Sequence, residues 1–316
     1  MTLAVTSSSP QAFSMEFPLW GVSAHVTVRL RGRNADPMLA AETLTAVRHW
    51  LVEAEARFSA ARPDSEVAQL QRGQLASAER SPELRELVDA VSWLQRDTGG
   101  AFRPWNPDGV YDASGYIKGW SIQRAIRLLQ QRGIRDAAIG VGDDIAVVGS
   151  ASEDSPWELT VAYRGTNGEG RAGAGSSSTP ERAALVLTPG CRHTGMAVAV
   201  SGDHARGDHI WLPAQGPQGT PGRPASLVVV VGEDAGLADA YATAVWAIAG
   251  TQGVPAALEW VEDRPGFGAA LLPRSGPMVT TSGLDRYICR PQASPVPSQG
   301  AARLPLHGDD GAAPVR

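Results

Sequence analysis

The chain has 316 residues and a net charge of −5, and its 28 basic residues form no basic stripe, which argues against a nucleic-acid partner. Its two cysteines, Cys191 and Cys289, lie far apart without further ligands at metal spacing, which argues against a thiolate metal site and a disulfide-rich secreted fold. No signal-like N-terminus and no apolar run of about 18 residues are present. We therefore expect a cytoplasmic protein without a membrane span that acts on a small molecule.

The first predicted elements are a strand and three helices. Residues 23–30 alternate between apolar and polar side chains, which is typical of a strand. A helix over 35–58 follows, with Asp36 as its N-cap. Apolar spacing predicts two more helices, one capped by Ser81 and one over 119–132.

Short apolar runs follow the third helix and indicate strands. They lie at 137–141, 144–149, 157–163, 183–188, 196–202, 226–232 and 269–273. A last helix is predicted over 233–250, ending at Gly250. Two Gly/Pro/Ser-rich segments, 164–182 and 212–224, are predicted to be long surface loops. The pattern favours an α+β fold with a mostly antiparallel sheet packed against helices.

The ends of the chain differ in composition from its middle. Residues 1–16 are polar and are expected to form a flexible tail, and the Pro/Ala/Gly-rich residues 291–316 are expected to be disordered. One domain over 17–290 lies between them.

The stretch DASGYIKG at 112–119 places an acid, small residues and a lysine directly before the third predicted helix. Ala113, Ser114 and Gly115 allow close backbone approach, and the free N–H groups of a helix start favour an anion. A phosphate-bearing ligand would suit this place. The alternative is an ordinary loop in which Asp112 and Lys118 are solvated or paired with each other.

The last helix carries a second group of polar residues. Asp239 and Thr243 are four positions apart and therefore neighbours, opposite the aliphatic stripe of the helix. Trp246 shares their side, so this face is expected to be covered by protein or by ligand. A carboxylate and a hydroxyl suit Mg²⁺, a hard cation that prefers oxygen. The alternative is a helix with a solvated polar face.

A third polar element is SGDHARGDHIWLP at 201–213, which follows a predicted strand. Its clustered acids and histidines, His209 among them, suit acid–base or metal chemistry.

Taken in order, these pieces resemble the ApbE family, the FAD:protein FMN transferases. The resemblance is carried by WGV (20–22), SAARPDSEV (59–67), GAFRP (100–104), DASGYIKG, GDDI (142–145), SGDHARGDHIWLP, ADAYATA (238–244) and TTSG (280–283). It covers roughly residues 17–290 and implies an ApbE-like, T-fold-related core. It also implies that the protein uses Mg²⁺ and FAD to attach FMN to a Thr or Ser of an acceptor flavoprotein.

The resemblance also implies roles for individual residues. Asp112 and His209 take catalytic positions. Residues of the FAD pocket are Trp20, Ala61, Ala101, Phe102, Arg103, Asp112, Lys118 and Trp211. The metal-binding positions are Gly115, through its main-chain oxygen, together with Asp239, Ala242 and Thr243. Lys118 is then expected to face the flavin or its pyrophosphate.

The chain departs from the family pattern at four positions. Arg103 and Leu212 replace aspartates, Asp143 replaces a glycine, and Ala61 replaces an aromatic residue. An Arg in place of Asp reverses a charge in a site built around phosphates and a cation. Two functions are therefore open. The chain either transfers FMN, with water in place of the acceptor making it an FAD pyrophosphatase, or binds FAD without transfer.

Overall fold

The apolar runs form antiparallel sheets in the computed structural model, which describes residues 2–5, 11–32, 36–105, 109–153, 155–164, 182–189, 195–202, 225–273 and 276–288. In these residues a large sheet has the strand order β11-β10-β9-β8-β5-β4-β3-β2 and a small sheet the order β1-β6-β7. The strands are β1 (Thr2–Val5), β2 (Ala12–Leu19), β3 (Val22–Arg29), β4 (Asp136–Val141), β5 (Asp144–Val148), β6 (Leu159–Arg164), β7 (Arg182–Leu187), β8 (Gly195–Gly202), β9 (Ala225–Gly232), β10 (Gly268–Pro273) and β11 (Val279–Thr280).

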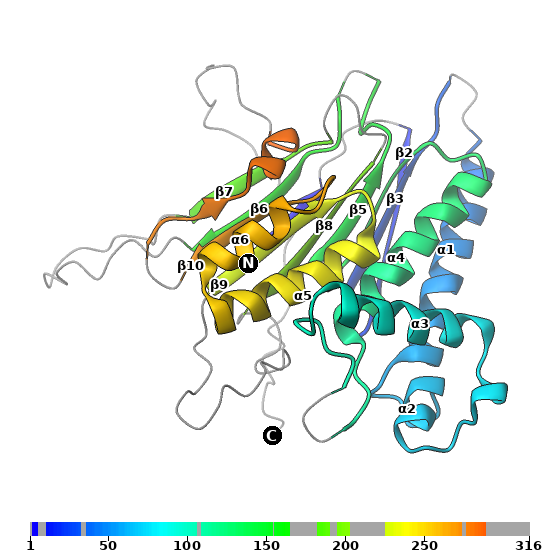
Figure 1. Ribbon diagram of the computed structural model, residues 1–316. Coiled ribbons are helices and arrows are strands. Elements are labelled where there is room, and N and C mark those ends of the chain that lie inside the picture. The colour runs from blue at the N-terminus through cyan, green and yellow to red at the C-terminus, as the bar shows by residue number, and fades with distance from the viewer. Residues whose placement is uncertain are drawn as a thin grey trace, which may run out of the picture.

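Helices cover one face of the large sheet (Figure 1). α1 packs on β2 and β3, α4 on β4 and β5, and α5 on β8 and β9. The helices are α1 (Pro37–Phe58), α2 (Glu66–Gln71), α3 (Pro82–Asp97), α4 (Ser114–Gln131), α5 (Ala235–Gln252) and α6 (Val254–Glu262), with 3₁₀ turns at Ser77–Glu79 and Ser282–Arg286.

In β4, β5, β8, β9 and β10 the large sheet is the middle layer and is buried on both faces, whereas in β2 and β3 buried residues alternate with exposed ones. In β9, Val228 and Val230 belong to the core shared with the helices, whereas Val229 and Val231 belong to a second core that includes Leu159 of the small sheet. A strand buried on both sides has no polar face, which explains its unbroken run of valines. The predicted α+β fold with a mostly antiparallel sheet is confirmed, with its strands divided between two sheets.

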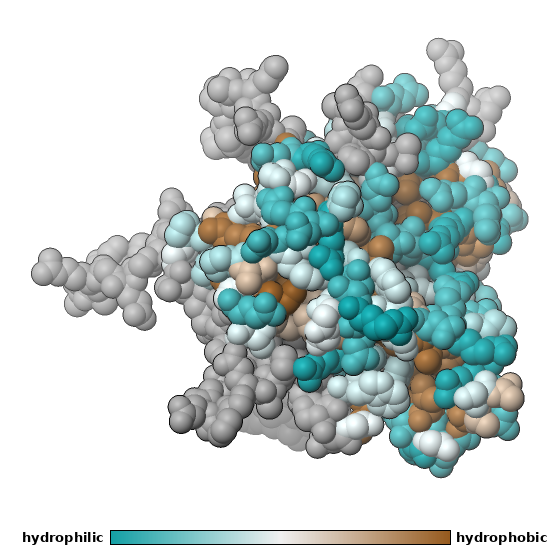
Figure 2. Space-filling view, viewed as in Figure 1, coloured by the Kyte–Doolittle hydropathy of each residue, from teal (hydrophilic) through white to brown (hydrophobic). Residues whose placement is uncertain are grey.

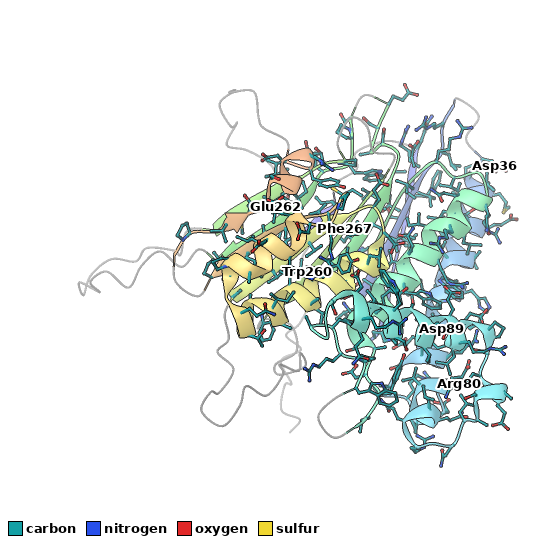
Figure 3. All side chains as sticks on the ribbon, in the orientation of Figure 1. Asp36, Arg80, Asp89, Trp260, Glu262 and Phe267 are labelled. Carbon is teal, nitrogen blue, oxygen red and sulfur yellow. The ribbon has the colours of Figure 1, made fainter. Side chains whose placement is uncertain are left out.

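The helix caps read from the sequence are present. The side chain of Asp36, labelled at the start of α1 in Figure 3, accepts a hydrogen bond from the Met38 N–H. Ser81 accepts from the Leu84 N–H in the same way at the start of α3. Such a cap contributes about 1 kcal/mol.

Two helices differ from their predicted bounds. α4 begins at Ser114, five positions earlier than predicted, so Lys118 lies within the helix and not before it. α5 continues past Gly250 to Gln252 and ends at Gly253, whose φ of 94° suits glycine. α6 follows directly, and aromatic residues of α6 and of the segment after it contact α5. The ring of Tyr241 packs edge-on against Trp260 and Phe267, both labelled in Figure 3, at centroid distances of 5.1 and 4.9 Å.

The N-terminal segment is more ordered than its composition suggests. Residues 2–5 form β1, which pairs with β6, and β2 begins at Ala12 and pairs along its length with β3. The flexible tail predicted over 1–16 is therefore wrong for both stretches. The predicted tail over 291–316 and most of the two predicted loops, 165–181 and 212–224, lie outside the described residues.

The helical face of the molecule is largely hydrophilic, with hydrophobic residues in small separate areas (Figure 2). Among the described residues, no helix is both long enough and apolar enough to cross a membrane.

Candidate active site

A cavity of about 550 Å³ lies where the β2–β3 hairpin, the end of α1, the segment before α2 and the start of α4 meet. This volume is in the range of small-molecule sites. Four residues predicted from the sequence line it together, although they come from three separate segments: Trp20, Ala61, Asp112 and Lys118. Glu55, Arg62 and Tyr111 also line it and were not predicted as site residues, although Arg62 lies within the SAARPDSEV motif.

Trp20 forms the hairpin side of this cavity. It occupies the first position of a two-residue turn with Gly21, and the two φ angles are 47° and 72°. Positive φ at both positions is typical of a type I′ hairpin turn, but it is unusual for a bulky side chain. The Trp20 N–H donates to Glu55 Oε1 at 2.9 Å, which ties the turn to α1. The indole is thereby held at the cavity.

The start of α4 forms the opposite side. Asp112 Oδ1 accepts a hydrogen bond at 2.9 Å from the N–H of Ser114, the first residue of α4, so this carboxylate satisfies one of the free N–H groups at the helix start. Ser114, Ile117 and Lys118 line the cavity. The cavity is therefore next to a helix N-terminus, where backbone N–H groups and the helix dipole favour an anion.

Lys118 and Asp112 are not paired with each other. The ammonium of Lys118 donates instead to Asp144 Oδ2, a carboxylate at the start of β5. Asp144 is the last acid of GDDI, and its role was not predicted from the sequence. The signal was present in the motif, but the partner of the lysine depends on how β5 packs against α4.

Tyr111 stays protonated at the wall of the cavity. Burial raises the pKa of its phenol well above the usual value, and the nearby charge of Asp112 raises it further. Its hydroxyl has no hydrogen-bond partner within the described residues. It can therefore serve as a donor to a ligand, but not as a base.

The predicted metal-binding residues meet where α4 crosses α5. A Cβ on Gly115 would lie 2.6 Å from Thr243 Oγ1, and one on Gly119 would lie 2.1 Å from the carbonyl oxygen of Ala235. Asp239 is 5 % exposed, and its Oδ2 accepts from the Gly119 N–H at 3.1 Å. The polar face of α5 is therefore covered by protein, and a solvated face is excluded. Two glycines allow this close crossing.

The donors at this crossing fit Mg²⁺ in kind. They are a buried carboxylate, a hydroxyl and the backbone next to them, all oxygen donors, and Mg²⁺ commonly takes only one or two carboxylates beside phosphates. Ala242 precedes Thr243 in α5 and is buried. The described residues contain no group of three or more His, Cys, Asp or Glu side chains that could hold a metal, at this crossing or elsewhere. α4 joins this crossing to the cavity, because Ser114 and Lys118 line the cavity and Gly115 and Gly119 contact α5.

The GAFR turn lies apart from the lining of the cavity. Phe102 is 2 % exposed and belongs to the core, and its N–H donates to Thr98 Oγ1. Arg103 is exposed, and its Nε donates to the Gly100 carbonyl. Neither they nor Ala101 line the cavity. His209 and Trp211 lie outside the described residues.

Two further motifs hold the fold. Ser65 Oγ caps α2 through the Ala68 N–H and donates to the Ser59 carbonyl. Glu66 accepts from Arg57 and from the Ser81 N–H. In TTSG, Thr281 is buried and its hydroxyl accepts from the Ala269 N–H of β10 at 2.7 Å. Ser65, Glu66 and Thr281 position segments and do not line the cavity.

Comparison with known proteins agrees with this architecture. The flavin transferase ApbE from Vibrio cholerae matches with a TM-score of 0.69 and 18 % identity, over 88 % of this chain and 99 % of its own. The apo flavinyl transferase ApbE of Pseudomonas stutzeri matches with a TM-score of 0.67 and 19 % identity, over 88 % of this chain and 96 % of its own. The ApbE protein of Thermotoga maritima matches with a TM-score of 0.65 and 17 % identity, over 89 % of this chain and 100 % of its own. No curated protein matches the sequence.

The likeness to solved structures establishes the fold. The model of the ApbE family matches residues 105–271, which contain α4, the large-sheet strands β4, β5, β8 and β9, and α5. This segment includes the α4–α5 crossing and the side of the cavity wall formed by the start of α4 and the residues before it. The chain therefore belongs to the ApbE family.

Proposed function

We propose that this chain is an FAD:protein FMN transferase that attaches FMN through a phosphoester bond to a Thr or Ser of an acceptor protein. The observation that carries the proposal is the position of the first turns of α4, which border the cavity on one side and Asp239 and Thr243 on the other. A dinucleotide bound there would have its pyrophosphate near a helix N-terminus, a lysine and a set of oxygen donors. Family membership supports the same reading.

The substrate is FAD, held between Trp20 and the start of α4. The indole of Trp20 offers a flat apolar surface for the flavin ring, and Lys118 offers N–H donors to the phosphates. Arg62, also at the cavity, adds a second positive charge. Fixing both ends of the dinucleotide aligns the FMN-side phosphorus with an incoming hydroxyl, which is how such a site lowers the barrier to phosphoryl transfer.

In the transfer step, the acceptor hydroxyl oxygen bonds to the FMN-side phosphorus and the bond from that phosphorus to the bridging oxygen breaks. The products are the FMN phosphoester and AMP, and the hydroxyl proton passes to a base. His209 and Asp112 are the candidates for that base. Asp239, Thr243 and the carbonyl of Gly115, with Ala242 beside them, would hold Mg²⁺, which when bound neutralises charge on the phosphates. Water in place of the acceptor would give FMN and AMP.

The test is AMP release. Purified protein is incubated with FAD and MgCl₂, and AMP is measured by chromatography, with and without an acceptor domain bearing a Thr or Ser flavinylation site. We expect AMP in both cases and a covalent flavin on the acceptor. FAD binding without AMP would support the alternative, a flavin-binding protein without transfer activity, and the absence of FAD binding would exclude both.

A matched pair of tryptophans tests the cavity itself. Trp20→Asn keeps a residue that tolerates positive φ but removes the ring. We expect the Kd for FAD to rise about tenfold, since an aromatic contact contributes roughly 0.5–1.5 kcal/mol beyond its buried area. Trp93→Asn on α3 removes an exposed indole away from the cavity and should leave the Kd unchanged.

A further inference from the structure

Asp144 is a buried carboxylate in direct contact with the lysine of the cavity. It is the first residue of β5, 2 % exposed, and pairs with Val141 across the Gly142–Asp143 turn. Its Oδ2 accepts from Lys118 Nζ, whereas its Oδ1 is buried without a hydrogen-bond partner in the described part of the chain. Lys118 has 18 % of its side chain exposed and lines the cavity.

The environment of Asp144 differs from that of the other buried acid in the sheet. Both oxygens of Asp136 are occupied, by Arg29, Arg31 and the Ser150 N–H, as expected for a carboxylate that holds strands together. Among the described residues, Asp144 has no hydrogen-bond partner for its second oxygen, which costs stability. The hydrogen bond described for its side chain is with Lys118, which lines the cavity.

We propose that Asp144 is a positioning residue that fixes the ammonium of Lys118 at the cavity wall for contact with the pyrophosphate of the dinucleotide. Lysine has a flexible four-carbon stem, so ordering it on binding costs entropy. A carboxylate on a rigid hairpin removes part of that cost in advance. The ammonium carries three N–H donors, and the bond to Asp144 uses one of them. This inference rests on the proposed function and adds a residue to it.

The test compares two ligands. Asp144→Ala should raise the Kd for FAD about tenfold, the loss of roughly one charge-assisted hydrogen bond. It should change the Kd for riboflavin, which has no phosphate, less than twofold. Asp144→Asn keeps an acceptor oxygen and should lie nearer to wild type. Equal losses for FAD and riboflavin would overturn the inference, because a general distortion of the cavity affects both ligands.

A double-mutant cycle gives an independent answer. Lys118→Met should weaken FAD binding, and adding Asp144→Ala to it should have little further effect, since Asp144 acts through Lys118. Additive losses would contradict the proposal. The control is Asp136→Asn, which should lower the melting temperature and leave both Kd values unchanged. A wild-type protein that binds no FAD would overturn the proposed function and this inference with it, whereas FAD binding with additive losses overturns the inference alone.

Discussion

At the scale of single residues, Asp239 shows how burial changes the meaning of a substitution. Helical spacing places it opposite the aliphatic stripe, where substitutions are usually within about ±0.5 kcal/mol. The structure buries it against α4, with its Oδ2 accepting from the Gly119 N–H. Its carboxylate therefore contributes to stability as well as to the proposed metal site, and a single variant does not separate the two.

Two substitutions at this position separate them. Asp239→Asn keeps an oxygen that can accept from the Gly119 N–H, whereas Asp239→Ala removes it. The free energy of unfolding should therefore be about 1–3 kcal/mol lower for Asp239→Ala than for Asp239→Asn. Urea unfolding without metal measures this difference. Under conditions where the Asp239→Asn variant is folded, its release of AMP from FAD should require more Mg²⁺ than the wild type needs. The neutral amide is a weaker ligand than a carboxylate for a hard cation. If the curves of AMP release against Mg²⁺ concentration were the same for the variant and the wild type, Asp239 would not be a metal ligand.

At the scale of elements, the α4–α5 crossing depends on glycine. A Cβ at Gly119 would lie 2.1 Å from the backbone oxygen of Ala235, which cannot move alone, whereas a Cβ at Gly115 would meet the side chain of Thr243. In an isolated helix both Gly→Ala changes would be favourable by about 1 kcal/mol.

We expect the two glycines to respond differently. Gly119→Ala should force the helices apart and lower the free energy of unfolding by roughly 1–3 kcal/mol. Gly115→Ala should cost less, since the Thr243 side chain can rotate and the gain in helix propensity offsets part of the loss. Urea titration of both variants measures the difference. A stabilised Gly119→Ala variant would mean that the crossing is looser than described.

Where β3, β4 and β5 meet, the contribution of Asp136 to stability depends on pH. Burial opposes ionisation of Asp136, but hydrogen bonds from Arg31 and the Ser150 N–H, with the charges of Arg29 and Arg31, hold its pKa below the usual value. Because the folded pKa is lower than the unfolded one, ionised Asp136 stabilises the fold above about pH 3.9. That contribution is lost as the pH falls through the folded pKa.

Asp136→Asn tests this contribution. At pH 7 the variant should be less stable by about 3–5 kcal/mol, since it leaves buried Arg29 without its charge partner. Below about pH 4 its stability should fall less steeply than that of the wild type, because it lacks the titrating carboxyl. Melting temperatures between pH 2.5 and 7 measure both effects. Parallel curves would show that Asp136 does not titrate differently on folding.

At the scale of the whole molecule, the small sheet joins distant parts of the chain. β1 at the N-terminus pairs with β6, and Leu187 of β7 forms a bridge with Ile288 near the end of the described residues. Together with the large sheet they enclose the second core, around Trp157. The cavity is on the other side of the large sheet, lined by the β2–β3 hairpin, α1, α2 and α4.

Deletion of residues 2–5 should therefore separate stability from binding. It exposes the edge of β6 and removes its ladder hydrogen bonds, each of which contributes about 1 kcal/mol. For a chain of this size, each kcal/mol lost lowers the melting temperature by about 2–4 °C. The Kd for FAD should stay within twofold of wild type at a temperature where both proteins are folded. A large rise in the Kd for FAD would show that the small sheet affects the cavity, contrary to the prediction.

Local patterns in the sequence determined much of this protein. Apolar runs gave the strands from β4 to β10, and Ser81 and Asp36 marked helix starts, because caps and strand periodicity depend on neighbouring residues. The ordered series of short motifs gave the family. The same patterns missed β1, because its pairing partner, β6, lies more than 150 residues away along the chain.

The tertiary structure decided which polar residues act together. Trp20, Ala61, Asp112 and Lys118 line one cavity, whereas Phe102 is in the core and Arg103 is outside the lining. Lys118 pairs with Asp144, on a strand 26 positions away, and not with Asp112 in the same motif. A sequence shows which residues can ionise or coordinate, but burial and pairing depend on how helices and strands pack, and those contacts are set by distant segments.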